Sequence, residues 1–193
     1  MRAPWITPAL LLLLAGPASG WQRADQERLR LGVPRATGEE SPPPPACQGC
    51  DLSGIHLTGY DLSKGSFRGA DLRGARLIGT DLSKADLRDA SLGGAKLIGT
   101  DLTRSDLRGA DLSGAILIGA DVSRSDLSGA DLRETRLIGA DLTRSNLRDA
   151  KLDAAALADA TLCHTTLPDG SVSERDCRPE EDAEATSGGE TAP

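Results

Sequence analysis

Apolar residues recur at every fifth position through the middle of this chain. From position 52 to position 167, all 24 such positions are apolar, and all are leucine except Phe67 and Val122. The residue two places before each of these centres is small in 22 repeats, the exceptions being Ile55 and Tyr60. The residue directly before the centre is Asp in twelve repeats. The pattern predicts an array of internal repeats, each five residues long.

A period of five fits neither regular helix nor regular strand. Leucines five apart would spiral around an α-helix and leave it without a buried face. In a straight strand, residues five apart point to opposite faces. The chain must therefore turn once in every repeat, so that the centre and the small residue before it both return to the interior. Glycine and short polar residues after each leucine supply the turn chemistry.

A longer period shows how many repeats close one coil. Leu-Ile-Gly occurs at 77–79, 97–99, 117–119 and 137–139, which is a period of twenty residues. Four repeats per coil give about six coils, stacked at the ~4.8 Å spacing of paired strands into a rod roughly 29 Å long. The leucines then form four internal columns. Phe67 and Tyr60 fall in or beside the first coil, where an open end is expected to accommodate their rings.

Triplets such as Ala70-Asp71-Leu72 and Ala130-Asp131-Leu132 carry a family resemblance. Positions 50–167 resemble the pentapeptide-repeat proteins, whose motif is a small residue, Asp or Asn, Leu or Phe, and two polar positions. The resemblance implies an all-β fold, a right-handed quadrilateral parallel β-helix. It also implies that residues before the centre point outward, so departures there alter the surface and leave the core intact. These departures are His56, Arg76, Lys96, Ile116, Arg136, Lys151 and Ala156.

The segments outside the repeats divide the chain into four parts. Residues 1–20 have the basic start, seven-residue apolar run and small-residue cleavage site of a signal peptide. Residues 21–46 end in four prolines and are predicted to be a linker, residues 47–177 form the solenoid, and residues 178–193 are predicted to be a disordered acidic tail. The apolar run is far shorter than the ~20 residues of a membrane span. We therefore expect an exported protein, periplasmic or extracellular, without a membrane span.

Two cysteines stand at each end of the repeats. Cys47 and Cys50 begin the first coil, whereas Cys163 and Cys177 bracket the exit from the last. The two groups are on the order of 25 Å apart along the rod, but a disulfide needs Cα atoms within about 7 Å. Two local disulfides that cap the ends are therefore predicted. The same separation of about 25 Å excludes a zinc site that uses cysteines of both groups together with His164. A redox role for the C-x-x-C motif stays open, although the motif lacks the βαβ setting of a thioredoxin-like protein.

Outward residues also stack, because the coil repeats every twenty residues. One face carries an apolar stripe with basic residues beside it, and a second carries a basic column in which each cation follows an aspartate by three residues. The stripe is either a stacking feature of β-branched side chains or a surface for a protein partner or a second copy. The basic column is predicted to pair with its aspartates. The stripe is Ile78, Ile98, Ile116, Ile118 and Ile138 beside Arg76, Lys96 and Arg136, and the column is Lys84, Arg104, Arg124 and Arg144.

Charge and side-chain chemistry narrow the function. The net charge is −7, with both signs interleaved through the repeats, which argues against a nucleic-acid binder. His56 and His164 lie at opposite ends, no metal-ligand or phosphate-loop spacing occurs, and no cofactor is expected. We expect a non-enzymatic scaffold that binds an unknown protein partner through a flat face. The alternative that the resemblance suggests is a DNA-mimicking protector of DNA gyrase, which the signal segment, the interleaved cations and the lack of a helical dimerisation segment disfavour.

Overall fold

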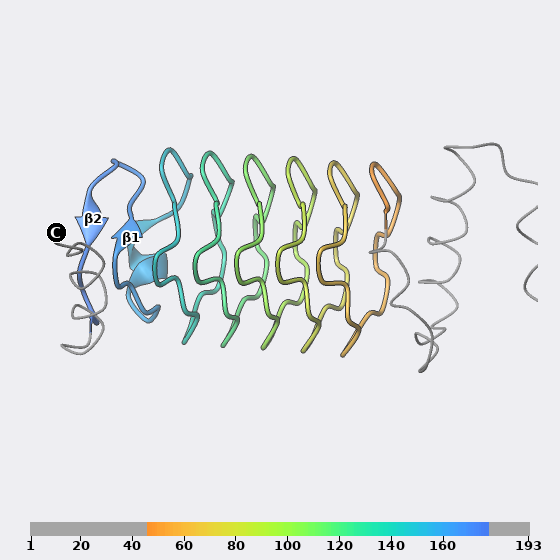
Figure 1. Cartoon of the computed structure of the whole chain (residues 1–193), viewed down its shortest axis with the longest axis horizontal. Coiled ribbons are helices and arrows are strands. Elements are labelled where there is room, and N and C mark those ends of the chain that lie inside the picture. Colours follow the sequence, from red (N-terminus) through yellow and green to blue (C-terminus); the bar gives the residue numbers. More distant parts are fainter. Residues whose placement is uncertain (1–45, 178–193) are drawn as a thin grey trace, which may run out of the picture.

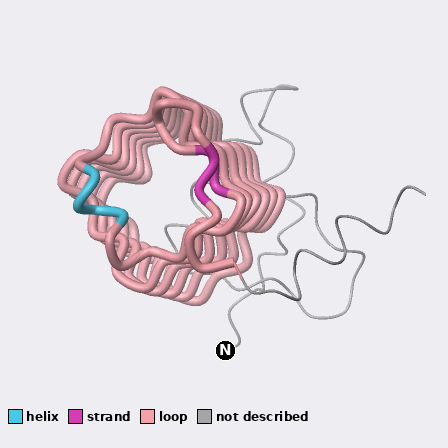
Figure 2. The backbone as a smooth tube through the Cα atoms, turned by 90° about the vertical axis from the view of Figure 1, so that its left-hand side faces the viewer, coloured by secondary structure: helices cyan, strands magenta, loops and turns pink. Residues whose placement is uncertain are grey.

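The computed structural model describes residues 46–177, which form a straight rod of stacked coils (Figure 1). The predicted signal segment, the linker up to residue 45 and the acidic tail lie outside the described residues. Seen along the rod, the coils superimpose into a closed four-sided ring (Figure 2). The chain therefore winds as a solenoid in which each coil lies directly on the one before it.

Parallel β-bridges join residues that are twenty apart. One coil contributes four of them, at Asp51 to Asp71, His56 to Arg76, Asp61 to Asp81 and Ser66 to Asp86. The hydrogen bonds are those of parallel strands: the N–H of Leu72 donates to the carbonyl of Ser91 at 2.7 Å, and the N–H of Asp71 donates to Cys50 at 2.8 Å. Each bridge is one residue long because a turn follows it. The period of twenty residues per coil is thus confirmed.

The core is the set of repeat centres and the small residues two places before them. All centres are buried except Leu152 and Leu167 in the last coils, which are partly exposed. Phe67 corrects one expectation, since its ring is 1% exposed and lies inside the closed interior. Cys47 stacks over it, as the N–H of Cys47 donates to the carbonyl of Ser66 at 2.7 Å. The ring therefore does not need an open end.

The corners of the square use left-handed backbone. The residue two places after most centres has φ near +60°, whether it is glycine, as at Gly79, or a larger residue, as at Arg104. The aspartate before the centre helps to form the turn, because its carboxylate accepts the N–H two residues on. Asp81 accepts from Ser83 in this way at 2.8 Å. This is the Asx turn, which explains why Asp is frequent before the centre.

Two neighbouring corners, at Ala154 and Asp159, depart from the pattern, because neither residue has positive φ. Residues Ala154–Leu157 form a 3-10 helix, η2. Ala154 occupies a corner position but does not adopt positive φ. Alanine favours helix and resists left-handed backbone by roughly 1–2 kcal/mol, so this alanine-rich repeat turns as a helix instead. As a result, within the described part of the chain no bridge joins Arg136 to the next coil, and Ala155, expected to face inward, is exposed.

The last coil ends in a short hairpin. Strands β1 (Thr165–Thr166) and β2 (Val172–Ser173) pair antiparallel, with Thr165 opposite Ser173. The turn between them contains Gly170, whose φ is +82°. The hairpin lies at the C-terminal end of the rod, with β2 beyond β1 (Figure 1), and its strands follow one wall of the ring (Figure 2). Among residues 46–177, no helix has the length and apolar character needed to cross a membrane.

Candidate interaction surfaces and end caps

The apolar stripe, here called the isoleucine ridge, consists of Ile78, Ile98, Ile118 and Ile138, with Ile116 beside them. Each member of the column follows a buried leucine and stacks on the next through the backbone. The N–H groups of Gly79 and Gly99 donate to the carbonyls of Ile98 and Ile118, at 2.9 and 3.0 Å. Three members of the column are therefore partly covered by the isoleucine of the next coil.

Ile138 ends this column and is the most exposed isoleucine of the ridge. Its side chain is 47% exposed, whereas Ile78, Ile98 and Ile118 are half-buried. In the next coil the N–H of Gly139 donates to the carbonyl of Asp159 at 2.8 Å, so Asp159 takes the place of an isoleucine, and η2 precedes it. The helical corner thus leaves the last isoleucine without a large apolar neighbour on one side.

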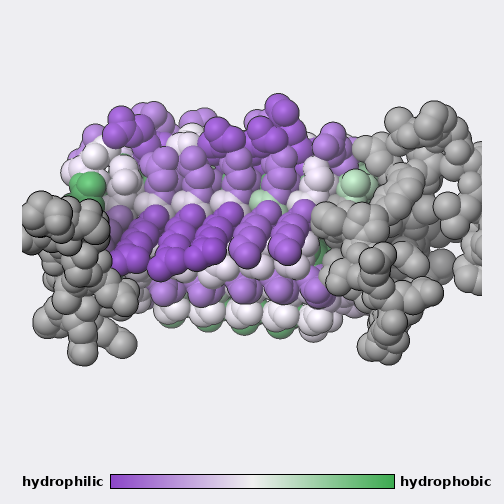
Figure 3. All heavy atoms as spheres, viewed as in Figure 1, coloured by the Kyte–Doolittle hydropathy of each residue, from purple (hydrophilic) through white to green (hydrophobic). Residues whose placement is uncertain are grey.

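Cations lie along the ridge. Arg76, Lys96 and Arg136 are exposed at the bridge positions of the same face, and none of them forms an ion pair within residues 46–177. Figure 3 shows hydrophilic residues in rows that repeat from coil to coil, with hydrophobic residues in a line along the lower edge of the view. The ridge is therefore a narrow apolar strip with a basic flank.

The basic column does not pair with its aspartates, contrary to the prediction. In the described part of the chain, no ion pair joins an aspartate to any of the four cations, which are Lys84, Arg104, Arg124 and Arg144. Each stands at a left-handed corner with φ between 57° and 60°, which turns its side chain away from the aspartate three residues earlier. The carboxylates bind backbone instead: the N–H groups that they accept, at 2.8 to 2.9 Å, belong to Ser83, Thr103, Ser123 and Thr143.

Ion pairs form at a different spacing, between an aspartate and the arginine two residues later. Arg108 is the example: its Nε lies 2.8 Å from one carboxylate oxygen of Asp106, and its Nη2 lies 2.6 Å from the other. The hydrogen bonds from Arg108 hold the pKa of Asp106 below its usual value. The same bidentate arrangement joins Asp71 to Arg73, Asp86 to Arg88, and Asp131 to Arg133, and it lowers the pKa of each aspartate.

Disulfides close both ends of the solenoid. Cys47 is bonded to Cys50, with Cα atoms 5.2 Å apart, and Cys163 to Cys177, with Cα atoms 4.7 Å apart. Cys47 and Cys163 are buried, so each bridge seals a terminal layer of the core. Cys163, His164 and Cys177 also bring three possible metal ligands within 4.8 Å of one another. Because both sulfurs are joined in the disulfide, only the imidazole of His164 is left among these three groups as a usual metal ligand.

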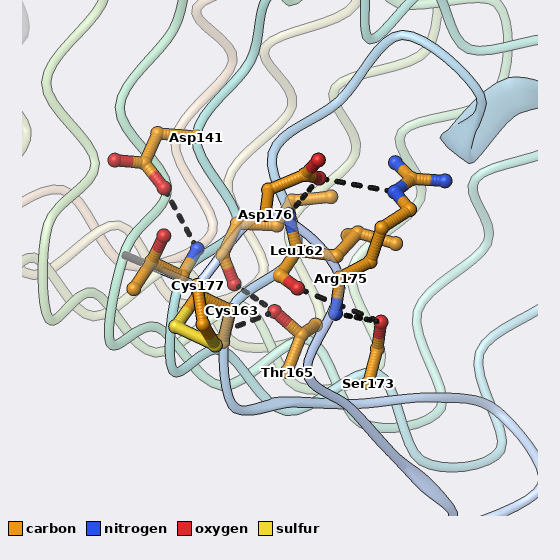
Figure 4. Close-up of a disulfide and its surroundings, with 10 residues drawn as sticks. Asp141, Leu162, Cys163, Thr165, Ser173, Arg175, Asp176 and Cys177 are labelled. Atoms are coloured by element: carbon orange, nitrogen blue, oxygen red, sulfur yellow. Dashed lines mark hydrogen bonds and ion pairs between the residues drawn. A yellow bond between two sulfur atoms is a disulfide. The ribbon is translucent and has the colours of Figure 1, made fainter. Parts of the chain in front are cut away.

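The C-terminal cap has a second component that the sequence reasoning missed. Arg175 donates through Nη2 to the carbonyls of Leu157 and Ala160, and through Nε to Asp176 at 3.0 Å. Asp176 in turn accepts the N–H of Leu162 at 3.2 Å (Figure 4). These side chains satisfy backbone groups that no further coil can reach. The clue available in the sequence was a charged pair just before the last cysteine.

Comparison with protein families identifies the repeats. The model described as pentapeptide repeats matches residues 50–89, 85–124 and 125–162, with eight copies. The chain belongs to the pentapeptide-repeat family. Its members are generally structural or interaction proteins without catalytic activity. The fold of this pentapeptide-repeat protein is the right-handed, four-sided parallel β-helix that the family resemblance implied.

One solved structure supports this fold, and two others are similar to part of the chain. The pentapeptide-repeat protein Rfr23 of the cyanobacterium Cyanothece 51142 is 27% identical, with a TM-score of 0.57 over 68% of this chain and 95% of that one. A pentapeptide-repeat protein of the Arabidopsis thaliana thylakoid lumen is 33% identical over 56% of this chain and 72% of that one, with a TM-score of 0.31. The fluoroquinolone resistance protein QnrB1 is 18% identical over 70% of this chain and 83% of that one, with a TM-score of 0.25. No curated protein sequence matches the chain.

Proposed function

We propose that this pentapeptide-repeat protein is an exported, non-enzymatic scaffold that binds a protein partner through the isoleucine ridge. The observation that carries the proposal is the exposure of Ile138, 47%, at the end of a straight apolar column. A contiguous apolar patch on the surface is a usual feature of a protein contact site. The other isoleucines extend the contact along the rod, and the straight stack holds them at a fixed spacing.

The flank of the ridge indicates the chemistry of the partner. Arg76, Lys96 and Arg136 form no ion pair within the described residues, so they remain available to carboxylates of another protein. A partner with an apolar strip bordered by acidic residues would satisfy both the isoleucines and the cations. Charge complementarity of this kind selects the partner and its orientation more than it adds affinity.

Export has two lines of support. The first twenty residues have the organisation of a signal peptide. In addition, all four cysteines are joined in disulfides, which persist in oxidising compartments and are rare in the cytosol. The protein is therefore proposed to act outside the cytoplasm, in the periplasm or beyond the cell.

No observation favours the alternative, a DNA-mimicking protector of gyrase. A mimic of duplex DNA presents rows of negative charge, but the aspartates of one face bind backbone N–H groups and others pair with Arg73, Arg88, Arg108 and Arg133. Columns of exposed cations run beside them. An uncleaved protein found in the cytosol, together with protection of gyrase in a supercoiling assay, would restore this alternative.

Site-specific photo-crosslinking in the exported fraction tests the proposal. A photoreactive residue at position 138 should give a discrete adduct with another protein. Position 133 is the matched control, because Arg133 also follows a repeat centre and is exposed, but on a neighbouring face. N-terminal sequencing of the adduct should begin near Trp21. Equal adducts from positions 133 and 138 would overturn the assignment of the ridge, and an adduct of two copies of this chain would show that the partner is a second copy.

A further inference from the structure

One corner of the rod is a continuous line of cations, here called the basic edge. It consists of Lys64, Lys84, Arg104, Arg124 and Arg144, one from each of five successive coils. All five have φ between 57° and 60° and all are exposed. None of their side chains forms a hydrogen bond or an ion pair within residues 46–177. At the spacing of paired strands, the charges follow one another every ~4.8 Å.

The surroundings of the basic edge limit what can bind to it. Aspartates border it on both faces, in the row that contains Asp101 and in the row that contains Asp106. These carboxylates are held close to the rod, Asp101 by the N–H of Thr103 and Asp106 by Arg108. The edge is therefore one residue wide. A broad anionic surface would be repelled by the two aspartate rows. A single extended acidic chain, in contrast, can bind along the line of cations.

The end of the basic edge lies where the acidic tail begins. Arg144 donates its backbone N–H to the carbonyl of Cys163 at 2.7 Å, so the chain at Cys163 stacks directly on the last cation of the edge. The disulfide then holds Cys177 beside Cys163 (Figure 4). Four acids follow within seven residues of Cys177, and a fifth lies farther along; they are Glu180, Glu181, Asp182, Glu184 and Glu190.

We propose that the acidic segment 180–190 binds along the basic edge of its own molecule. The lengths agree: Lys84 is four coils from Cys163, about 19 Å. Seven extended residues from Cys177 to Glu184 reach about 23 Å. Single exposed ion pairs are weak, but the tether at Cys177 makes the contact intramolecular and so raises the effective concentration of the tail. The tail then occupies the edge and excludes other acidic chains from it.

Zero-length carbodiimide cross-linking of the full mature protein tests this, because the protein has four lysines in informative places. Lys64 and Lys84 lie on the edge, whereas Lys96 and Lys151 are exposed on other faces. Lys151 is a strict control, since it is closer to the end cap along the rod than Lys84. Tail peptides should cross-link to Lys84 at least about fivefold more than to Lys96 or Lys151 at low ionic strength, and about 0.5 M NaCl should abolish the preference.

A charge-matched pair of variants gives the second readout. The triple variant Arg104→Gln, Arg124→Gln, Arg144→Gln removes three cations of the basic edge. It should lose most of the cross-link between the tail and Lys84. The triple variant Arg73→Gln, Arg133→Gln, Arg136→Gln removes the same number of charges from exposed arginines that do not border the basic edge, and it should keep the cross-link to Lys84. Three results would overturn the proposal: even cross-linking to all exposed lysines, the same yield in both triple variants, or cross-links found only between two molecules.

Discussion

Gly65 lies against the ring of Phe67, and the absence of a side chain at the first residue makes room for the ring of the second. A Cβ atom at Gly65 would collide with the ring and would lie 2.8 Å from the carbonyl oxygen of Leu62. The φ of Gly65 is not in the left-handed region, so its backbone does not require glycine. Space is the reason for glycine here. The only aromatic centre of the repeats is thus matched by the only glycine two places before a centre.

Replacement of Gly65 by alanine should therefore destabilise the rod by roughly 1–3 kcal/mol, the usual cost of overpacking a core. Phe67→Leu in the same molecule should recover most of this loss, because it removes the ring that the new methyl group strikes. Urea denaturation of the two single variants and the double variant gives the interaction energy between the two positions. Simple additivity of the two changes would contradict the account.

A different glycine depends on its backbone. Gly119 has φ of +62°, and a Cβ there would have no neighbour within 4 Å. Gly119→Ala should nevertheless cost about 1 kcal/mol, since an L-residue resists this conformation. Gly93 is the matched control: its φ is not positive, and a Cβ would make only ordinary contacts at 3.7–3.8 Å. Gly93→Ala should be neutral or stabilising by about 0.4–1 kcal/mol. Equal effects at both positions, measured by urea denaturation, would refute the distinction.

Acid should weaken the rod through the aspartates that pair with arginines. Hydrogen bonds from arginine lower the folded-state pKa of Asp71, Asp86, Asp106 and Asp131 below the unfolded value near 3.9. Below that pH the unfolded chain binds protons that the folded chain does not, so the stabilisation is complete above about pH 4–5 and is lost as the pH falls through the folded pKa values.

The test compares the free energy of unfolding at pH 7 and at several values below pH 4. The wild type should lose stability steadily over the acid range. In the variant Arg73→Gln, Arg88→Gln, Arg108→Gln, Arg133→Gln, the same aspartates should titrate near their ordinary pKa, so the curve should be flatter. Parallel acid curves for the two proteins would show that other carboxylates control acid unfolding.

The two disulfides should differ in how much each adds to the free energy of unfolding. Closing the fifteen-residue loop from Cys163 to Cys177 is worth about 3 kcal/mol in the chain-entropy model, and the four-residue loop from Cys47 to Cys50 about 2 kcal/mol. Cys163→Ser with Cys177→Ser should also release the cap in which Arg175 binds the carbonyls of the last coil. Its unfolding midpoint should therefore fall further than that of Cys47→Ser with Cys50→Ser. A larger effect at the N-terminal end would contradict this ranking.

The sequence determined the coil and its inside and outside. Leucines five apart cannot share a face of a helix or a strand, and the twenty-residue recurrence of Leu-Ile-Gly specifies four repeats per coil. Both inferences succeed because every residue of a solenoid meets mainly the residues twenty places before and after it. The parallel bridges from Asp51 to Asp71 and onward have the predicted spacing. The two disulfides also follow from distance along the rod.

Tertiary structure decided which charges meet and how the ends are closed. Lys84 and Asp81 are near in sequence, yet the left-handed corner separates them, while Arg108 reaches Asp106 from the flat face. The helical corner at Ala154–Leu157 exposes Ile138, and Arg175 folds back to an end that no repeat covers. These outcomes depend on side-chain directions at corners and on groups left over at the last coil. A periodic pattern describes the average repeat, so it does not contain them.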